Sequence, residues 1–158
     1  MTDCAWECDR VLKIVLCVNC WKGGGFKLPP SGEICILGDF KYRQEIRKDR
    51  PDRENTPEIR GEKIGDLYPE QFDKVLLDTP CSGEGRFTIY NVQSYKTWSP
   101  KTVNDLTKMQ RKLFKSAFNA LKPNGTLVYS TCTFSLQEDE AVIEWFLDIY
   151  QDMKVCPV

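Results

Sequence analysis

The chain has 158 residues, of which 41% are hydrophobic and 28% are charged, a composition typical of a globular protein with one core. It contains no apolar run near the ~20 residues that span a bilayer. Acidic rather than basic residues precede the short apolar stretch at 11–18, which argues against a signal peptide. We therefore expect an intracellular protein, in the cytoplasm or the nucleus and nucleolus, with no membrane contact. Because the net charge is −1, contact with a nucleic acid would need a local basic patch.

The first part of the chain, residues 1–32, is a segment whose structure the sequence does not define. Residues 11–18 fit either a helix or a strand, and the glycines at 23–25 are typical of a flexible joint. The irregular spacing of all eight cysteines favours reduced thiols over disulfides. Four of them fall here and are either incidental, which we expect, or zinc ligands: Cys4, Cys8, Cys17 and Cys20.

The second part, residues 33–158, begins with a predicted strand at 33–37 that ends at Gly38 and Asp39. Residues 41–63 are rich in both signs of charge and nearly lack apolar side chains. Such a stretch cannot bury a face, so we predict a solvated loop or insertion.

A strand, a turn and a helix follow. Residues 73–78 predict a buried strand, and a turn bearing two glycines at 82–85 comes after it. Ser99 followed by Pro100 is typical of a helix start. The helix has an apolar stripe made of Leu106, Met109, Leu113, Phe114, Ala117 and Leu121. In this prediction the turn at 123–125 ends the helix.

A second strand at 126–131 and a second helix at 137–150 come next. One face of that helix is apolar and consists of Val142, Trp145, Phe146 and Ile149. The order strand, helix, strand, helix predicts an α/β fold with a mainly parallel, Rossmann-like sheet. With three strands predicted, the sheet would keep open edges unless residues 1–32 or a partner chain complete it.

In sheets of this kind ligands bind at the carboxyl ends of the strands, and reactive side chains fall there in this sequence. Asp78 and Cys81 follow one strand and Cys132 follows the next. Each has an ordinary alternative, since a cysteine after a strand is often a small buried hydrophobe and an aspartate can cap a turn. Because both segments occur together, each directly after a strand, a catalytic role is favoured over these alternatives.

The two segments resemble the catalytic motifs of a known family. Asp-Thr-Pro-Cys-Ser-Gly-Glu-Gly at 78–85 and Tyr-Ser-Thr-Cys-Thr at 129–133 are similar to those of the NSUN family, which includes the RsmB/RsmF-like proteins. These are RNA cytosine-5 methyltransferases that use S-adenosylmethionine. The sequences at 97–100, 121–125 and 137–140 match the family as well, so the resemblance covers about 72–150. It implies a methyltransferase fold, with 33–158 as part of a catalytic domain acting on tRNA or rRNA.

The resemblance also implies roles for the reactive side chains. Carbon 5 of cytosine is a poor nucleophile, so Cys132 would first add to carbon 6 of the ring. Cys81 would assist release of the product, and Asp78 would hydrogen-bond ring nitrogen 3. A free thiol with a pKa near ~8.5 is mostly protonated at neutrality, so the folded site should favour the thiolate of Cys132.

The methyl-donor site is less complete in this sequence. By resemblance, Asp78, Pro80 and Asp39 would contact S-adenosylmethionine. The glycine-rich turn that usually holds such ligands is not recognisable, because the glycines at 23–25 follow no clear strand. The family's final strands are missing too, so we expect a truncated domain.

Two functions remain open from the sequence. The first is an RNA methyltransferase that flips a cytosine into its site. The second is an inactive methyltransferase-like domain that binds RNA or a protein. Basic side chains on the first predicted helix either meet phosphates or form an ordinary solvated face: Lys108, Arg111, Lys112, Lys115 and Lys122.

Overall fold

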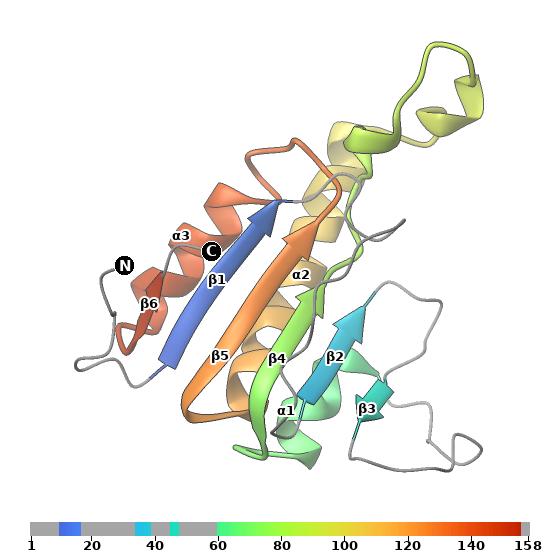
Figure 1. Ribbon diagram of the computed structural model, residues 1–158. Coiled ribbons are helices and arrows are strands. Elements are labelled where there is room, and N and C mark those ends of the chain that lie inside the picture. The colour runs from blue at the N-terminus through green and yellow to red at the C-terminus, as the bar shows by residue number, and fades with distance from the viewer. Residues whose placement is uncertain (1–9, 17–33, 39–44, 48–59, 156–158) are drawn as a thin grey trace, which may run out of the picture.

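The computed structural model describes residues 10–16, 34–38, 45–47 and 60–155. Its strands form one sheet (Figure 1). Its strands are β1 (Arg10–Leu16), β2 (Ile34–Gly38), β3 (Glu45–Arg47), β4 (Phe72–Asp78), β5 (Leu121–Thr131) and β6 (Met153–Val155). They lie in the order β3-β2-β4-β5-β1-β6. β3 is antiparallel to β2 and every other neighbouring pair is parallel, so the predicted α/β fold with a mainly parallel sheet is confirmed.

The expectation of three strands was too low. β1, from the segment that fitted either a helix or a strand, lies between β5 and β6. β3 lies inside the charged stretch at 41–63, which was predicted as a loop. β3 and β6 have three residues each, too few for an alternating pattern to be visible. Because β1 pairs with β5, residues on both sides of position 32 contribute to the same sheet.

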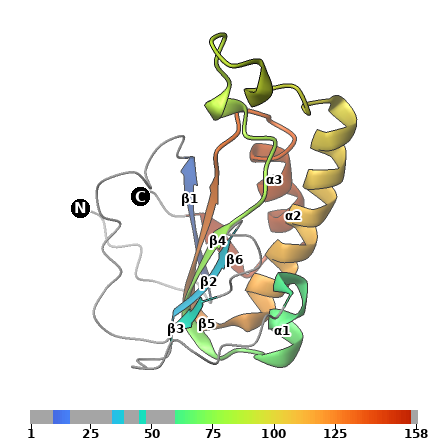
Figure 2. The same ribbon diagram turned by 90° about the vertical axis from the view of Figure 1, so that its right-hand side faces the viewer.

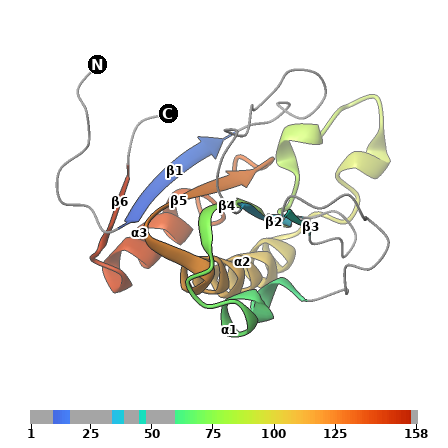
Figure 3. The ribbon, with the colours of Figure 1, turned by 60° about the horizontal axis from the view of Figure 1, so that its bottom comes forward.

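Three helices cover one face of this sheet (Figures 2 and 3). They are α1 (Ile64–Leu67), α2 (Pro100–Ala120) and α3 (Glu140–Ile149), and short 3-10 turns occupy Gly61–Lys63, Glu84–Arg86 and Val92–Ser94. The core lies between the helices and the sheet. At its centre the ring of Phe146 packs against the rings of Phe114, Phe118 and Tyr150, with centroids 4.0, 5.4 and 4.4 Å away.

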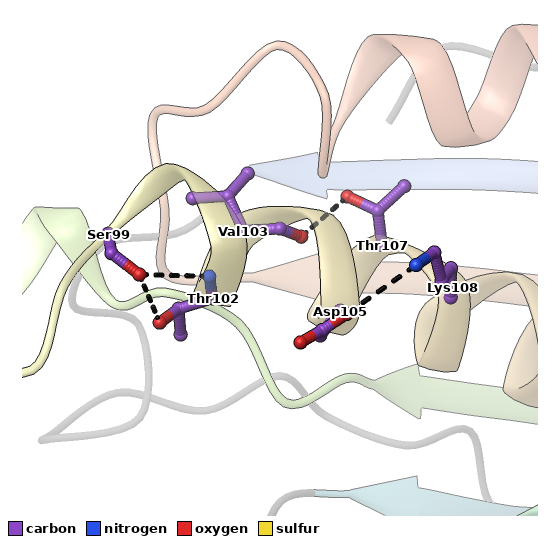
Figure 4. Close-up of polar contacts among 6 residues, drawn as sticks. All are labelled: Ser99, Thr102, Val103, Asp105, Thr107 and Lys108. Carbon is purple, nitrogen blue, oxygen red and sulfur yellow. Dashed lines mark hydrogen bonds and ion pairs between the residues drawn. The ribbon is translucent and has the colours of Figure 1, made fainter.

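The start of α2 agrees with the prediction (Figure 4). Ser99 has extended backbone angles, and its Oγ accepts a hydrogen bond from the N–H of Thr102 over 3.1 Å. Pro100, the first helical residue, needs no N–H partner. Further along, the hydroxyl of Thr107 donates to the carbonyl of Val103 over 2.9 Å, and Lys108 forms an ion pair with Asp105 over 3.5 Å. The capped end places the helix directly after the 87–98 loop.

The buried face of α2 differs from the prediction at one important place. Leu113, Phe114 and Ala117 are buried as expected. Met109, however, is 40% exposed, while the polar Gln110 beside it is completely buried. A helical hydrophobic pattern cannot identify a buried amide, because burial of such a group depends on hydrogen-bond partners from other elements.

The junction of α2 and β5 corrects the predicted helix end. Leu121, predicted as part of the helix, is the first residue of β5. The turn at 123–125 therefore lies inside the strand, where Asn124 has a left-handed φ of 62°. The pairing of β4 with β5 shifts register at this turn. The turn accordingly shapes the beginning of the strand and does not end the helix.

α3 begins later than predicted. Residues 137–139 form a turn in which the N–H groups of Glu138 and Asp139 both bond to the carbonyl of Ser135. Within the helix, Val142 and Phe146 are buried as predicted. Ile149, predicted on the same apolar face, is 54% exposed, whereas Ile143, which was not predicted there, is buried.

The parallel arrangement brings the carboxyl ends of β4 and β5 to one edge of the sheet, from which their following loops project (Figure 1). Among the described residues, no helix is long and apolar enough to cross a membrane.

Candidate active site

The loops after β4 and β5 bring two thiols into contact. Asp78 lies opposite Ser130 where the two strands end, and the N–H of Thr79 donates to the carbonyl of Ser130 over 3.0 Å. Cys81 and Cys132 follow these ends, and their Sγ atoms are 3.2 Å apart. The structure thus gathers the two cysteines and Asp78 at the edge where sheets of this class bind ligands.

The electrostatics of the thiol pair are unequal. The N–H of Cys132 donates to the Sγ of Cys81 over 3.3 Å, and the N–H of Gly85 donates to the carbonyl of Cys132 over 3.0 Å. The side-chain hydrogen bond with Cys132, followed by burial, raises the pKa of Cys81 well above its ordinary range. Two thiolates in contact would repel each other, so one proton stays within the pair.

A buried carboxylate connects the two cysteine loops. Glu138 is completely buried, and its Oε1 accepts hydrogen bonds from the N–H of Ser82 (2.9 Å) and from Nε2 of Gln110 (3.0 Å). Its Oε2 accepts from the hydroxyl of Thr133 over 3.4 Å, and the hydroxyls of Ser82 and Thr133 are 2.7 Å apart. Ser82 and Thr133 each directly follow one of the two cysteines. Glu138 therefore fixes one loop relative to the other.

Gln110 holds the opposite side of the first cysteine loop. Its Nε2 also donates to the carbonyl of Pro80 over 2.9 Å, which immediately precedes Cys81. Gln110 comes from α2 and Glu138 from the turn that leads into α3. α2 and the turn before α3 thus secure the residues on either side of Cys81.

Asp139 holds the end of β5, directly before Cys132, in place. Its Oδ1 accepts a hydrogen bond from the hydroxyl of Thr131 over 2.6 Å, and the hydroxyl of Tyr129 donates to the carbonyl of Glu138 over 2.7 Å. Burial raises the pKa of Asp139 to about 6, although the bond from Thr131 acts in the opposite direction. Burial also raises the pKa of Tyr129, which remains a phenol that can donate.

A cavity of about 390 Å³ opens beside Cys81, within the size range of small-ligand sites. The indole N–H of Trp98 donates to Oε1 of Glu84 over 2.8 Å, which fixes the ring in the cavity wall. Gly83 has a left-handed φ of 70°, and a Cβ there would approach the guanidinium of Arg86 to 2.8 Å. The lining residues are Cys81, Ser82, Gly83, Arg86, Ser94, Thr97, Trp98, Thr102 and Leu106.

Several basic side chains of α2 and the following strand have partners within the chain, which favours the ordinary solvated face over phosphate binding. These pairs are Lys108 with Asp105 (3.5 Å), Lys122 with Asp73 (3.1 Å) and Arg111 with the ring of Trp145 (5.0 Å).

Asp39, a predicted donor-site residue, lies outside the described residues. The same is true of the glycines at 23–25, which did not fit a donor loop, and of the cysteines at 4, 8, 17 and 20, which were expected to be incidental. The preceding Gly38 is described, and its backbone lies opposite Asp78 in the β2–β4 pair. Among the side chains that the structure describes, no group of three or more histidine, cysteine, aspartate or glutamate residues could hold a metal ion.

Sequence reasoning missed Gln110 and Trp98 as site residues. Gln110 carried a signal, since an amide inside an apolar stripe is either misplaced or hydrogen-bonded to something important. Trp98 belongs to a segment that matched the family resemblance, but its position in a cavity wall depends on the bond to Glu84 across the loop.

Comparison with known sequences finds a methyltransferase family that matches most of this chain. The family model described as 16S rRNA methyltransferase RsmB/F matches residues 44–158. The chain is similar to ribosomal RNA small subunit methyltransferase F of Salmonella arizonae, with 50% identity over 92 residues, and of Klebsiella pneumoniae, with 46% identity over 99 residues. These matches cover 58% and 62% of the chain but 19% and 20% of the relatives. The chain therefore spans about a fifth of the length of the curated relatives it matches.

Solved structures give the same result for the fold. The crystal structure of PH0851 matches with a TM-score of 0.52 and 33% identity, covering 58% of this chain and 20% of that one. The structure of NSun6 from Pyrococcus horikoshii with SFG matches with a TM-score of 0.50 and 28% identity, covering 59% and 23%. The methyltransferase fold expected from the sequence is confirmed over this part of the chain.

Proposed function

The chain belongs to the 16S rRNA methyltransferase RsmB/F family, and on this basis we propose that it methylates carbon 5 of cytosine in RNA. The observation that carries the proposal is the 3.2 Å contact between the thiols of Cys81 and Cys132 at the carboxyl edge of the sheet. The names of its relatives favour ribosomal RNA over tRNA as the substrate. The location that follows from this function is intracellular, where these RNAs are found.

In this proposal Cys132 is the nucleophile. Its thiolate forms a bond to carbon 6 of a flipped cytosine, and the electron pair moves toward carbon 5 and ring nitrogen 3. The similarity of residues 129–133 to the family's second cysteine motif supports this assignment. Asp78, at the same edge, would carry a proton and give it to nitrogen 3 as negative charge develops there, which leaves Asp78 as a carboxylate.

Cys81 acts in the second half of the reaction. When Cys132 is bonded to carbon 6, the hydrogen bond between the two thiols is lost, and with it the main cause of the raised pKa of Cys81. Cys81 can then lose its proton to solvent and take the proton from methylated carbon 5. The bond between Cys132 and carbon 6 breaks, and the thiolate of Cys132 is regenerated.

The residues at the junction of β2 and β4 fit S-adenosylmethionine as the methyl donor. Asp78 lies opposite Gly38 at the carboxyl ends of two parallel strands, and its carboxyl oxygens can complement a positively charged sulfonium. We place Asp78, Pro80 and Asp39 in this donor site. When bound, S-adenosylmethionine supplies the methyl group that carbon 5 receives.

Replacement of Cys81 tests whether Cys132 forms the covalent bond and Cys81 is needed to release it. A Cys81→Ala chain incubated with cytosine-containing RNA and S-adenosylmethionine should accumulate a covalent RNA adduct, because Cys132 can add to the ring but release is blocked. Denaturing gel electrophoresis of labelled RNA measures the adduct. The Cys132→Ala chain and the double variant should form none.

Unchanged turnover in Cys81→Ala, or an adduct that persists in Cys132→Ala, would refute these assignments. Calorimetric titration with S-adenosylmethionine provides an independent control. If the chain binds S-adenosylmethionine but forms no adduct, the roles assigned to the thiols are wrong, while the donor site is intact.

A further inference from the structure

The loop at residues 87–98, between the first cysteine loop and α2, presents apolar and aromatic side chains to solvent. It projects beyond the carboxyl ends of β4 and β5 (Figure 1, yellow-green). The exposed fractions are 83% for Ile89, 93% for Tyr90, 57% for Val92, 41% for Tyr95 and 42% for Trp98. Large apolar side chains gathered at a surface are typical of a binding site.

Internal contacts of the 87–98 loop order its backbone and the ring of Tyr95. The rings of Phe87 and Tyr95 pack edge to face with centroids 6.1 Å apart. The hydroxyl of Ser94 accepts a hydrogen bond from the N–H of Thr88 over 3.0 Å and donates to the carbonyl of Asn91 over 2.7 Å. A loop with its own hydrogen bonds offers a preformed surface, so binding requires little further ordering.

The charge of this region suits a polyanion. Between Glu84 and Asp105 the sequence contains three basic residues, Arg86, Lys96 and Lys101, and no acidic residue. All three are exposed. This stretch therefore carries a local excess of positive charge in a chain whose net charge is −1.

The 87–98 loop is continuous with the cavity beside Cys81, because Ser94, Thr97 and Trp98 belong to its wall. An RNA strand whose target base occupies the site would pass its neighbouring nucleotides over this loop. Aromatic rings beside basic side chains are the combination that binds unpaired bases through stacking and phosphates through charge.

We propose that the 87–98 loop is a stacking platform for the unpaired nucleotides that flank the target cytosine, with Tyr90 as its main contact. This inference rests on the proposed function for the position of the target base. The basic residues favour single-stranded RNA over a protein partner, since an apolar protein contact would gain nothing from them.

Equilibrium binding of a fluorescein-labelled single-stranded RNA of twelve nucleotides tests the platform, with anisotropy as the readout. The Tyr90→Ala chain should bind about five- to a hundredfold more weakly than the unaltered chain. Tyr90→Phe keeps the ring and should restore binding. Ile149→Ala, which removes an exposed side chain of α3, is the matched control and should bind like the unaltered chain. A version of the RNA with uridine in place of cytosine should show the same dependence on Tyr90, because stacking tolerates any base.

Equal affinity of Tyr90→Ala and the unaltered chain would overturn the platform and leave the loop as a surface for a protein. Absence of RNA binding by the unaltered chain would overturn it as well, while the adduct experiment decides the methylation chemistry separately. A dependence on Tyr90 in a chain that forms no adduct would support the platform and refute only the proposed reaction.

Discussion

Glu138 and Asp139 are adjacent buried acids whose surroundings differ in the number of hydrogen-bond donors. The carboxylate of Glu138 accepts bonds from Ser82, Gln110 and Thr133. Within the described part of the chain, the carboxylate of Asp139 accepts one, from Thr131. Burial with a single donor disfavours the charged form, which explains why the pKa of Asp139 rises to about 6. The folded protein consequently binds a proton here more tightly than the unfolded chain does.

This imbalance predicts how stability depends on pH. As pH rises from near 4 to above 6, the folded state must give up a proton that the unfolded state has already lost, so the free energy of unfolding falls. Asp139→Asn keeps an oxygen acceptor for Thr131 and removes the charge. Because the pKa shifts from 3.8 to about 6, the variant should be more stable at pH 8 by up to about 3 kcal/mol and similar at pH 4. Urea denaturation across this range measures the difference, and a constant difference at every pH would contradict the assignment.

At the scale of elements, α2 and the turn before α3 act on the cysteine loops through polar contacts from the helix-covered side of the sheet. Gln110 bonds to the residue before Cys81, while Glu138 bonds to the residue after it. Both side chains are completely buried. The position of the first thiol therefore depends on the packing of two helices against the sheet and not on the loop alone.

Replacement of Gln110 tests this dependence. Gln110→Leu leaves the carbonyl of Pro80 without its donor from Gln110 and removes one of three donors to the buried Glu138, so it should destabilise the fold by about 1–3 kcal/mol. The amide of Ser82, which bonds to Glu138, should exchange its hydrogen faster than in the unaltered chain. Met109→Leu changes the neighbouring, partly exposed position and should remain within about 0.5 kcal/mol. Urea denaturation and hydrogen exchange provide the two readouts, and identical behaviour of both variants would contradict a structural role for Gln110.

The sequence predicts some of these elements well and others poorly, for physical reasons. The strand before Asp78 and the helix start at Ser99 follow from local patterns, namely a short apolar run and a capping side chain. The end of α2 at Ala120 could not be predicted, since Leu121 continues the helical stripe but pairs with β4. Pairing between strands overrides local periodicity at such a junction.

At the scale of the molecule, the site assembles from residues distant in the chain. Cys81 and Cys132 are 51 positions apart and meet because β4 and β5 are parallel neighbours connected through α2. Motif resemblance and topology together were sufficient to expect the two cysteines at one edge. The contact of their sulfur atoms, the cavity beside them and the helices on one face depend on packing, which no pattern in the sequence specifies.

The long chain segment between the thiols leads to a prediction for the whole fold. Hydrogen peroxide should convert the two thiols into a disulfide, with two molecules of water as the other product. Closing a loop of this length should stabilise the folded state by up to about 4 kcal/mol, because the unfolded chain loses conformational freedom. Peptide mapping by mass spectrometry identifies the Cys81–Cys132 link, and urea denaturation before and after oxidation measures the gain. Cys132→Ser should show neither the link nor the gain, and thiol reductant should reverse both in the unaltered chain. If the two cysteines remain reduced while the protein is folded, the sulfur contact does not persist in solution, and the proposed chemistry would lose the observation that carries it.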